Sequence, residues 1–487
     1  MNIKEATQIV DNPPHNGKFK LELYDFQKKA VEFMEAHPRC LNASEMGVGK
    51  TVEALKLCQE LNLRHVLIIC PKTLVGEWFM QTDRITGEGA LTPHENSQYE
   101  HRLSGLDLKG PRFVCVNYDL LPNSKCWSAL TSVKWDCIIA DECHKLKNHK
   151  SKRTQAMYLL APYATRVVLM SGTPLQNYPT DLFPLFHLME PSKYRSYNQW
   201  VEWFCQTVLE TVWVRNKNGT PVPRQFKQIV GSKNTEQLNQ LLHFYMHRDL
   251  KKDVLPELPD KVHRTIPVSL GHERKQYEEM KKELFALLDN GEVITAPAVI
   301  AQITRLRQIT LDPNLLASES PRPSTPSNKT ATLLELIEGT EDKIVIYTYF
   351  ERYTQILSQE LSHRNIEHVL ITGQVPTMER ARNIDTFQSG SKCRVCLCTI
   401  TAGGEGITLT ASHIVVFTDR AWNPATNWQA EDRLHRIGQK NSVLVVDLYC
   451  QGTIEDHLLK IVRRKEDMIE KVVTAKVIES MRRERGN

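Results

Sequence analysis

The sequence lacks three features that would place it in other classes of protein. Its 487 residues contain no apolar run near the roughly 18 residues that a membrane span needs. The first residues, Met1 to Ala6, do not form the pattern of a secretory signal peptide. Twelve cysteines in a chain of this length do not indicate a disulfide framework. We therefore expect an intracellular protein with no membrane partner.

The sequence also lacks a dominant charge sign. With 62 Lys+Arg and 57 Asp+Glu, the formal net charge of +5 permits a nucleic-acid partner but does not prove one. Cys393 and Cys396 have metal-like spacing, but no second pair of cysteines or histidines accompanies them, so a zinc site is disfavoured. Because single cores stop growing at roughly 250 to 300 residues, the length predicts two or three domains.

Short continuous apolar runs recur in both halves of the chain, which is typical of parallel strands buried on both faces. In the first half these runs are Val66–Cys70, Phe113–Val116, Cys137–Ala140 and Val167–Met170. In the second half they are Ile344–Tyr347, Val369–Ile371, Val395–Cys398, Ile414–Phe417 and Val443–Val446. Helical patterns lie between the runs, so the predicted fold class is α/β with two similar lobes.

The middle of the chain breaks this alternation. Apolar residues at helical spacing, such as Tyr277 and Met280, indicate helices there, and the proline- and serine-rich stretch Ser318–Asn328 is typical of a linker. The predicted organisation is an extension (1–18), a first lobe (19–190), helical insertions with a connector (191–330), a second lobe (331–462) and a helical tail (463–487).

A phosphate-binding loop is predicted between Ala43 and Thr51. Such a loop needs glycines for close approach of backbone N–H groups, a lysine for the β and γ phosphates, and a hydroxyl for magnesium. Gly47, Gly49, Lys50 and Thr51 meet these needs, and the following helix adds a dipole that favours anions. Ser44 stands where the general pattern has its first glycine.

Two adjacent carboxylates follow the predicted strand Cys137–Ala140. Ligand-binding groups of α/β sheets collect at the carboxyl ends of strands, and adjacent side chains leave a strand end in different directions. We therefore predict that Asp141 holds Mg²⁺ and that Glu142 orients and deprotonates the attacking water. Together with the phosphate loop, this pair predicts a nucleotide triphosphatase.

Arg433 and Arg436 are predicted to supply cationic side chains from the second lobe. Three residues apart on an expected helix, they would project from one face, and the guanidinium fork suits the spread charge of a transferring phosphoryl group. Because Lys50 lies in the first lobe, a hydrolysis-competent site would form only when the lobes close. That division predicts a motor.

The motifs in combination resemble a superfamily 2 helicase-type ATPase of the SWI/SNF type, from about Leu23 to Asp456. The segments that carry this resemblance are Leu23–Gln27, Cys70–Thr73, Val116–Tyr118, Ser171–Asn177, His247–Lys261, Thr399–Gly406 and Trp422–Gln439. The resemblance implies two RecA-like lobes, each a parallel sheet flanked by helices, with helical insertions between them.

The resemblance also implies roles for single residues. Gln27 would contact the adenine base, and Gly404 and Gly406 would contribute to nucleotide binding. The residues that would couple hydrolysis to lobe movement are Ser171, Thr173 and Gln429. Those that would contact a DNA backbone are Lys72, Thr73, Asn117, Thr399, Thr401 and Trp422. Capping of turns is the alternative for the Thr and Asn residues, and packing within a lobe is the alternative for Trp422.

Two departures from the family pattern qualify these assignments. Cys143 stands where many members have Ala, Ser or Gly, and Asp141–Asn148 looks closest to the HARP-like annealing-helicase branch. Glu405 places a negative charge near the expected DNA track, which puts the contacts carried over to that segment in doubt.

The resulting expectation is an ATP- and Mg²⁺-dependent translocase on double-stranded DNA that remodels DNA or DNA-bound protein, with annealing or regression of branched DNA among its forms. We expect a monomer that binds duplex or branched DNA without sequence specificity. Its location would be cytoplasmic in a prokaryotic or viral host and nuclear in a eukaryote. The alternatives are an RNA or single-strand unwinding helicase and a non-hydrolysing DNA-binding scaffold.

Overall fold

The computed structural model describes residues 22–92, 112–215, 221–289, 296–316, 325–403 and 407–473. Contacts divide the chain into two compact units. Unit 1 comprises residues up to Val208, Lys227–Pro256 and the residues from Asp467 onward, whereas unit 2 comprises Leu209–Phe226 and Glu257–Glu466. Among the described residues, no helix has the length and apolar character needed to cross a bilayer.

Unit 1 is built on a seven-stranded sheet in the order β3-β4-β2-β5-β6-β1-β9, in which every neighbouring pair is parallel. Its strands are β1 (Arg39–Asn42), β2 (Val66–Cys70), β3 (Ala90–Leu91), β4 (Phe113–Asn117), β5 (Trp135–Asp141), β6 (Ala164–Met170) and β9 (Met246–His247). Its helices are α2 (Asp25–Ala36), α3 (Lys50–Glu60), α4 (Val75–Thr86), α6 (Ser124–Thr131), α7 (Lys152–Leu160), α8 (Phe183–Met189), α9 (Tyr197–Phe204), α10 (Thr235–Tyr245) and α11 (Lys251–Val254).

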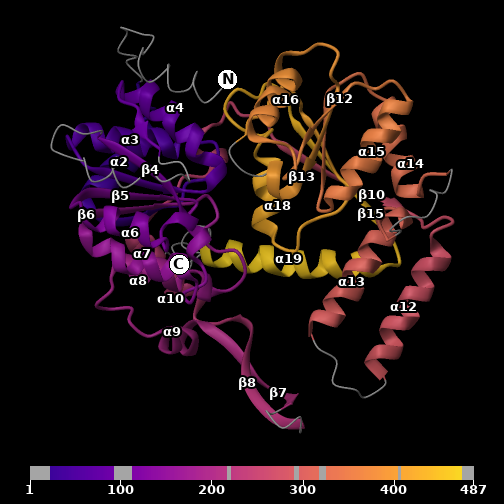
Figure 1. Cartoon of the computed structure of the whole chain (residues 1–487), viewed down its shortest axis with the longest axis horizontal. Helices are drawn as coiled ribbons and strands as arrows, with labels where there is room; N and C mark the ends of the chain where they lie inside the picture. The colour runs from indigo at the N-terminus through magenta and orange to yellow at the C-terminus, as the bar shows by residue number, and fades with distance from the viewer. Residues whose placement is uncertain are drawn as a thin grey trace, which may run out of the picture. The chain divides into compact units, whose positions relative to one another are not determined.

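Helices cover both faces of this sheet, as Figure 1 shows. On one face Met34 of α2, Leu55 of α3 and Trp78 of α4 pack against alternate strand residues such as Ile68 and Ile139. Strand β2 is a continuous apolar run because it is buried on both faces, and every residue of Val66–Cys70 is buried. This core fixes the carboxyl ends of the strands in one row.

Unit 2 is built on a six-stranded parallel sheet in the order β10-β15-β14-β11-β13-β12. Its strands are β10 (Lys261–Val268), β11 (Ile344–Thr348), β12 (His368–Ile371), β13 (Val395–Thr399), β14 (Ile414–Phe417) and β15 (Val443–Cys450). Its helices are α12 (Arg274–Asp289), α13 (Ala296–Leu311), α14 (Asn328–Glu338), α15 (Glu351–His363), α16 (Thr377–Ser389), α17 (Ile400–Gly403) and α18 (Pro424–Glu431). Helix α19 (Ile454–Val473) closes the described part of the chain.

The two faces of the second sheet belong to two separate core clusters. On one face Phe387 of α16 packs with Val345 and Tyr347 of β11. On the other face Leu333 of α14 and Tyr353 of α15 pack with Ile344 and Ile346 of the same strand. The alternation follows the two-residue period of a strand.

The predicted fold class is confirmed, and every predicted strand is present within a few residues of its expected ends. The interval 191–330 contains strands as well as the predicted helices. Two of them are edge strands: β9 lies at one edge of the seven-stranded sheet, and β10 lies at one edge of the six-stranded sheet. A further pair, β7 (Cys205–Arg215) and β8 (Pro221–Ser232), forms a two-stranded sheet. Of the predicted linker, residues 318–324 lie outside the described part of the chain.

Candidate nucleotide-binding site

The predicted phosphate loop connects β1 to α3 in unit 1. Gly47 and Gly49 have φ angles of 81° and 106°, in the left-handed region that favours glycine. A Cβ atom at Gly49 would lie 2.3 Å from Nε2 of Gln27, so a larger residue there would also have to displace the Gln27 side chain. Lys50 and Thr51 are the first two residues of α3, where backbone N–H groups and the helix dipole favour an anion.

The ammonium group of Lys50 is held by the loop itself. Its Nζ donates hydrogen bonds to the main-chain oxygens of Ser44 at 2.7 Å and Glu45 at 2.9 Å. Burial lowers the pKa of Lys50, while the nearby carboxylates of Glu142 and Asp141 oppose that shift. An ammonium has three donors, so one more remains to meet a phosphate oxygen.

Asp141 ends β5, where its position is fixed by three neighbours. The indole Nε1 of Trp78 donates to Oδ2 at 2.9 Å, the N–H of Glu142 donates to Oδ1 at 2.9 Å, and the hydroxyl of Tyr118 donates to the main-chain oxygen at 2.7 Å. Burial, with the charge of Glu142 as the next cause, raises the pKa of Asp141 to about 6. A bound cation would reverse this effect.

Glu142 adopts a left-handed backbone conformation with a φ angle of 50°. Such conformations cost a non-glycine residue free energy and are found at functional sites. Its Oε2 lies 3.1 Å from Nδ1 of His144 and accepts a hydrogen bond from Ser171 Oγ at 3.4 Å, and His144 Nδ1 lies 3.0 Å from Ser171 Oγ. Glu142 is thus linked to Ser171, the first residue after β6, both directly and through His144.

Two of the three predicted coupling residues, Ser171 and Thr173, lie at this connection in unit 1. The hydroxyl oxygen of Ser171 also accepts a hydrogen bond from the N–H of Thr173 at 3.2 Å, and both residues are buried. The third predicted coupling residue, Gln429, is buried on α18 in unit 2. The coupling roles stay predictions.

The side chain of Gln27 packs directly against the phosphate loop. Its Nε2 donates to the main-chain oxygen of Val48 at 2.9 Å, and its Oε1 accepts from the N–H of Tyr24 at 3.1 Å. The amide nitrogen therefore ties α2 to the loop, while the amide oxygen caps the start of α2. Its contact with an adenine base stays a prediction.

Arg433 and Arg436 are not on a helix, which corrects the sequence-based expectation. Helix α18 ends at Glu431, and both residues lie in turns beyond it. These turns are tied down by tertiary hydrogen bonds, such as that from Leu409 N to Arg433 O at 2.9 Å, which local spacing does not reveal.

The two guanidinium groups nevertheless converge within unit 2. Nη1 of Arg433 and Nη1 of Arg436 both donate to the main-chain oxygen of Ile407, at 3.5 Å and 3.2 Å, and Arg436 also donates to Thr408 Oγ1 at 2.9 Å. The predicted nucleotide-binding residues Gly404 and Gly406, together with Glu405, lie outside the described residues.

The predicted DNA-contacting residues have different surroundings. Lys72 and Thr73 are exposed on the short 3-10 helix Lys72–Leu74 after β2, and Thr401 is exposed on α17. Asn117 is buried and its Oδ1 accepts from Asp119 N at 3.0 Å, so it caps a turn; Thr399 is buried at the end of β13. DNA contact by any of them stays a prediction.

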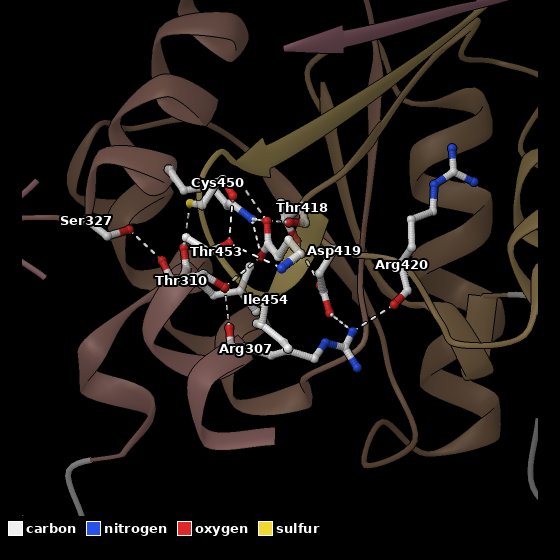
Figure 2. Close-up of polar contacts among 12 residues, drawn as sticks. Arg307, Thr310, Ser327, Thr418, Asp419, Arg420, Cys450, Thr453 and Ile454 are labelled. Carbon is white, nitrogen blue, oxygen red and sulfur yellow. Dashed lines mark hydrogen bonds and ion pairs between the residues drawn. The ribbon is translucent and has the colours of Figure 1, made fainter. Parts of the chain in front are cut away.

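Trp422 packs within unit 2. The guanidinium carbon of Arg307 lies 5.7 Å from the centroid of its ring, within the range of a cation–π interaction. Figure 2 shows Arg307 pointing to Asp419 and to the main-chain oxygen of Arg420, its partners at 3.0 Å and 2.7 Å. These contacts support the packing alternative for Trp422; its contact with DNA stays a prediction.

Two residues of the site were not assigned roles from the sequence. His144 connects Glu142 to Ser171, and Trp78 supports Asp141. His144 could have been found, because it directly follows the carboxylate pair and Cys143. Trp78 could not, because it lies 63 residues before Asp141 in the sequence and only the packing of α4 on the sheet brings them together.

Comparison with protein-family models decides the family. The SNF2-related domain matches residues 26–315, which is more than half of the chain. This chain belongs to the SNF2-related family. The helicase conserved C-terminal domain matches residues 328–438. The resemblance to SWI/SNF-type ATPases is therefore confirmed.

The curated relatives are longer than this chain, whereas the similar solved structure is of comparable length. The DNA annealing helicase and endonuclease ZRANB3 of Mus musculus is 28% identical over 457 residues, covering 92% of this chain and 40% of that protein. The ATP-dependent helicase brm of Drosophila melanogaster is 27% identical and covers 94% of this chain and 29% of that protein. The Sulfolobus solfataricus SWI2/SNF2 ATPase core in complex with dsDNA aligns over 96% of each chain with 23% identity and a TM-score of 0.44. This chain thus spans less than half the length of these two curated relatives.

Proposed function

We propose that this chain is a DNA-dependent ATPase that translocates on double-stranded DNA and remodels DNA or protein–DNA complexes. The observation that carries the proposal lies in unit 1. Lys50 is held at the start of α3 by main-chain oxygens of its own loop, within the field of Asp141 and Glu142. Membership of the SNF2-related family and the names of the relatives supply DNA as the partner.

The residues present fit a magnesium ion. Mg²⁺ is usually held by one or two carboxylates with substrate phosphates and water rather than by a full protein cage. Asp141 offers a carboxylate whose orientation is fixed by hydrogen bonds from the indole of Trp78 and the N–H of Glu142. Thr51, the second residue of α3, offers a hydroxyl. When bound, the ion would neutralise charge on the β and γ phosphates.

In this proposal each residue has a separate task. Lys50 and the first N–H groups of α3 bind and orient the phosphates, while Glu142 orients the attacking water and accepts its proton. His144 and Ser171 hold the carboxylate of Glu142 in place. Arg433 and Arg436 are proposed to stabilise the charge of the transferring phosphoryl group, which Arg433→Lys would test by lowering hydrolysis without weakening ATP binding.

Annealing or regression of branched DNA is the finer form of this activity that we propose. It rests on the similarity to annealing helicase ZRANB3 and on the likeness of Asp141–Asn148 to the HARP-like branch. An RNA or single-strand helicase remains a second candidate only by superfamily resemblance, and a non-hydrolysing scaffold is disfavoured by the complete set Lys50, Asp141 and Glu142.

The test is ATP hydrolysis across a panel of duplex, forked, single-stranded and RNA ligands at one fixed salt concentration, since nucleic-acid affinity depends steeply on salt. The proposal predicts the largest stimulation by duplex or forked DNA. Equal rates with and without duplex would refute the translocase, and the largest stimulation by RNA or single strands would favour the second candidate. Reannealing of a melted fork in the presence of ATP would test the finer form.

A further inference from the structure

The segment Met246–Lys251, which we call the clamp, lies directly against the phosphate loop in unit 1. Its first two residues form β9 and pair in parallel with the end of β1, Met246 opposite Leu41 and His247 opposite Asn42. The pairing continues beyond the strand into the loop. The N–H of Ala43 donates to His247 O at 2.8 Å, and the N–H of Glu45 donates to Asp249 O at 2.9 Å.

Side chains of the loop complete the attachment. The N–H of Asp249 donates to Ser44 Oγ at 3.2 Å, and the N–H of Lys251 donates to Glu45 Oε2 at 2.8 Å. Ser44 stands where the general phosphate-loop pattern has glycine, which has no hydroxyl to accept such a bond. The serine at position 44 therefore adds a hydrogen bond between the loop and the clamp that a glycine could not make.

The guanidinium group of Arg248 contacts both the start of the loop and Gly172. Its Nη1 donates to Ala43 O at 2.7 Å and, at a longer 3.5 Å, to Gly172 O in the Ser171 segment. Burial lowers the pKa of Arg248, and the carboxylate of Glu45 opposes that shift. One guanidinium group thus joins the phosphate loop to the segment whose Ser171 contacts Glu142.

The clamp holds the same two residues that hold the catalytic lysine. Lys50 donates to the main-chain oxygens of Ser44 and Glu45, and these residues are bonded to Asp249 and Lys251. Along the chain α11 starts at the last residue of the clamp, and the longer segment of unit 2, Glu257–Glu466, follows.

We propose that the clamp positions the phosphate loop for nucleotide, with Arg248 as its main positioning residue. The inference rests on the proposed ATP hydrolysis for its kinetic part only. Its structural part, the rigidity of the loop without nucleotide, stands independently.

Arg248→Ala tests the clamp against a matched control, Arg39→Ala. Arg39 is also an arginine of unit 1 that donates to two main-chain oxygens, Leu188 O at 2.8 Å and Ala161 O at 3.1 Å, and burial lowers its pKa as well. Its contacts lie in other segments of the unit. In hydrogen exchange of the nucleotide-free protein, we expect faster exchange of the amides of Ala43–Lys50 in Arg248→Ala but not in Arg39→Ala.

The kinetic readout separates positioning from general stability. In Arg248→Ala we expect the KM for ATP to rise by roughly tenfold, the size that loss of one charge-assisted hydrogen bond gives, with a smaller change in kcat. Affinity for a duplex of fixed length at fixed salt should not change. Arg248→Lys keeps a donor for Ala43 O, so it should recover part of the loss, and it replaces Arg248→Ala in both assays if that variant does not fold.

The outcomes of the inference and of the proposed function are distinguishable. If the wild-type protein hydrolyses no ATP with DNA, the proposed function fails, and hydrogen exchange still decides the clamp. If Arg248→Ala exchanges and hydrolyses like Arg39→Ala, the clamp does not position the loop and the inference is wrong.

Discussion

Two lysines, one partly buried in unit 1 and one fully buried in unit 2, show how differently a cation can be held. In unit 1 Lys50 donates to the uncharged main-chain oxygens of Ser44 and Glu45, and burial lowers its pKa. In unit 2 Lys329 is fully buried and its Nζ lies 2.8 Å from Oε1 of Glu455. Burial disfavours the charge there too, but the field of Glu455 outweighs it and raises the pKa of Lys329.

The surroundings of Glu455 complete the contrast. Thr310 Oγ1 donates to Oε1 at 2.6 Å and the N–H of Cys450 donates to Oε2 at 2.7 Å, while Lys329 also donates to Thr418 O at 2.9 Å. Figure 2 shows Thr310, Thr418 and Cys450 gathered around this network. The ion pair of Lys329 with Glu455 links α13, α14, β15 and α19. In our proposal Lys50, which is held by carbonyl oxygens, instead binds an anionic phosphate.

Breaking the paired lysine has the largest expected effect. Lys329→Ala leaves the carboxylate of Glu455 buried without its partner and should lower the free energy of unfolding of unit 2 by about 3 to 5 kcal/mol. Urea unfolding followed by tryptophan fluorescence measures this change. In the double variant Lys329→Met with Glu455→Gln, part of the loss should be recovered because no charge remains buried. A loss in the single variant below about 1 kcal/mol would contradict the structural role.

Removing the proposed general base tests the opposite case, a site built for chemistry rather than stability. Glu142→Gln should lower kcat for ATP hydrolysis by about 10²- to 10³-fold, because an amide cannot accept the proton of water. ATP affinity and the unfolding midpoint should change little. Steady-state kinetics with a nucleotide-binding assay give both numbers. Unchanged kcat would assign the proton to another group.

Trp78→Phe sharpens the comparison by changing only the support of a carboxylate. The phenyl ring keeps most of the packing on the sheet but removes the donor to Asp141 Oδ2. We expect the Mg²⁺ concentration for half-maximal hydrolysis to rise by roughly tenfold, as for other partners of metal ligands. Trp135→Phe is the matched control, because its indole donates to Leu130 O instead. An equal shift in both variants would mean that the effect is general packing.

Arg307→Lys has the smallest expected effect. An ammonium keeps the charge near Asp419 but loses the planar contact with Trp422 and the fixed position from which Nη2 reaches both Asp419 and Arg420 O. We expect a loss of about 0.5 to 1 kcal/mol in the free energy of unfolding. Thermal unfolding measures it. A loss as large as that in Lys329→Ala would show that the Arg307 contacts are as important as the buried pair.

The sequence predicted most strands of the two sheets, because those strands are parallel and buried on both faces and each is a continuous apolar run. It did not predict β10, most of whose side chains are exposed at the sheet edge and which includes Pro267. Nor did it predict β9, because two residues carry no pattern. Local composition therefore identifies a strand only where burial requires a continuous run of apolar residues.

The nucleotide loop and the carboxylate pair were predictable because their residues are adjacent in sequence. The contacts of Arg248 with Ala43, or of Lys329 with Glu455, join residues that are 205 and 126 positions apart. The turns around Arg433 depend on a main-chain bond from Leu409. Such contacts follow from the packing of elements, and helical spacing alone led to the wrong element for Arg433 and Arg436.

The most direct test of the account compares ATP hydrolysis by the wild-type protein and by Lys50→Ala, each with and without duplex DNA at one salt concentration. The account predicts that DNA raises the wild-type rate, that Lys50→Ala stays about 10²- to 10³-fold below it, and that both proteins unfold at similar urea concentrations. Hydrolysis by Lys50→Ala at the wild-type rate, or a wild-type rate that does not respond to duplex DNA, would contradict it.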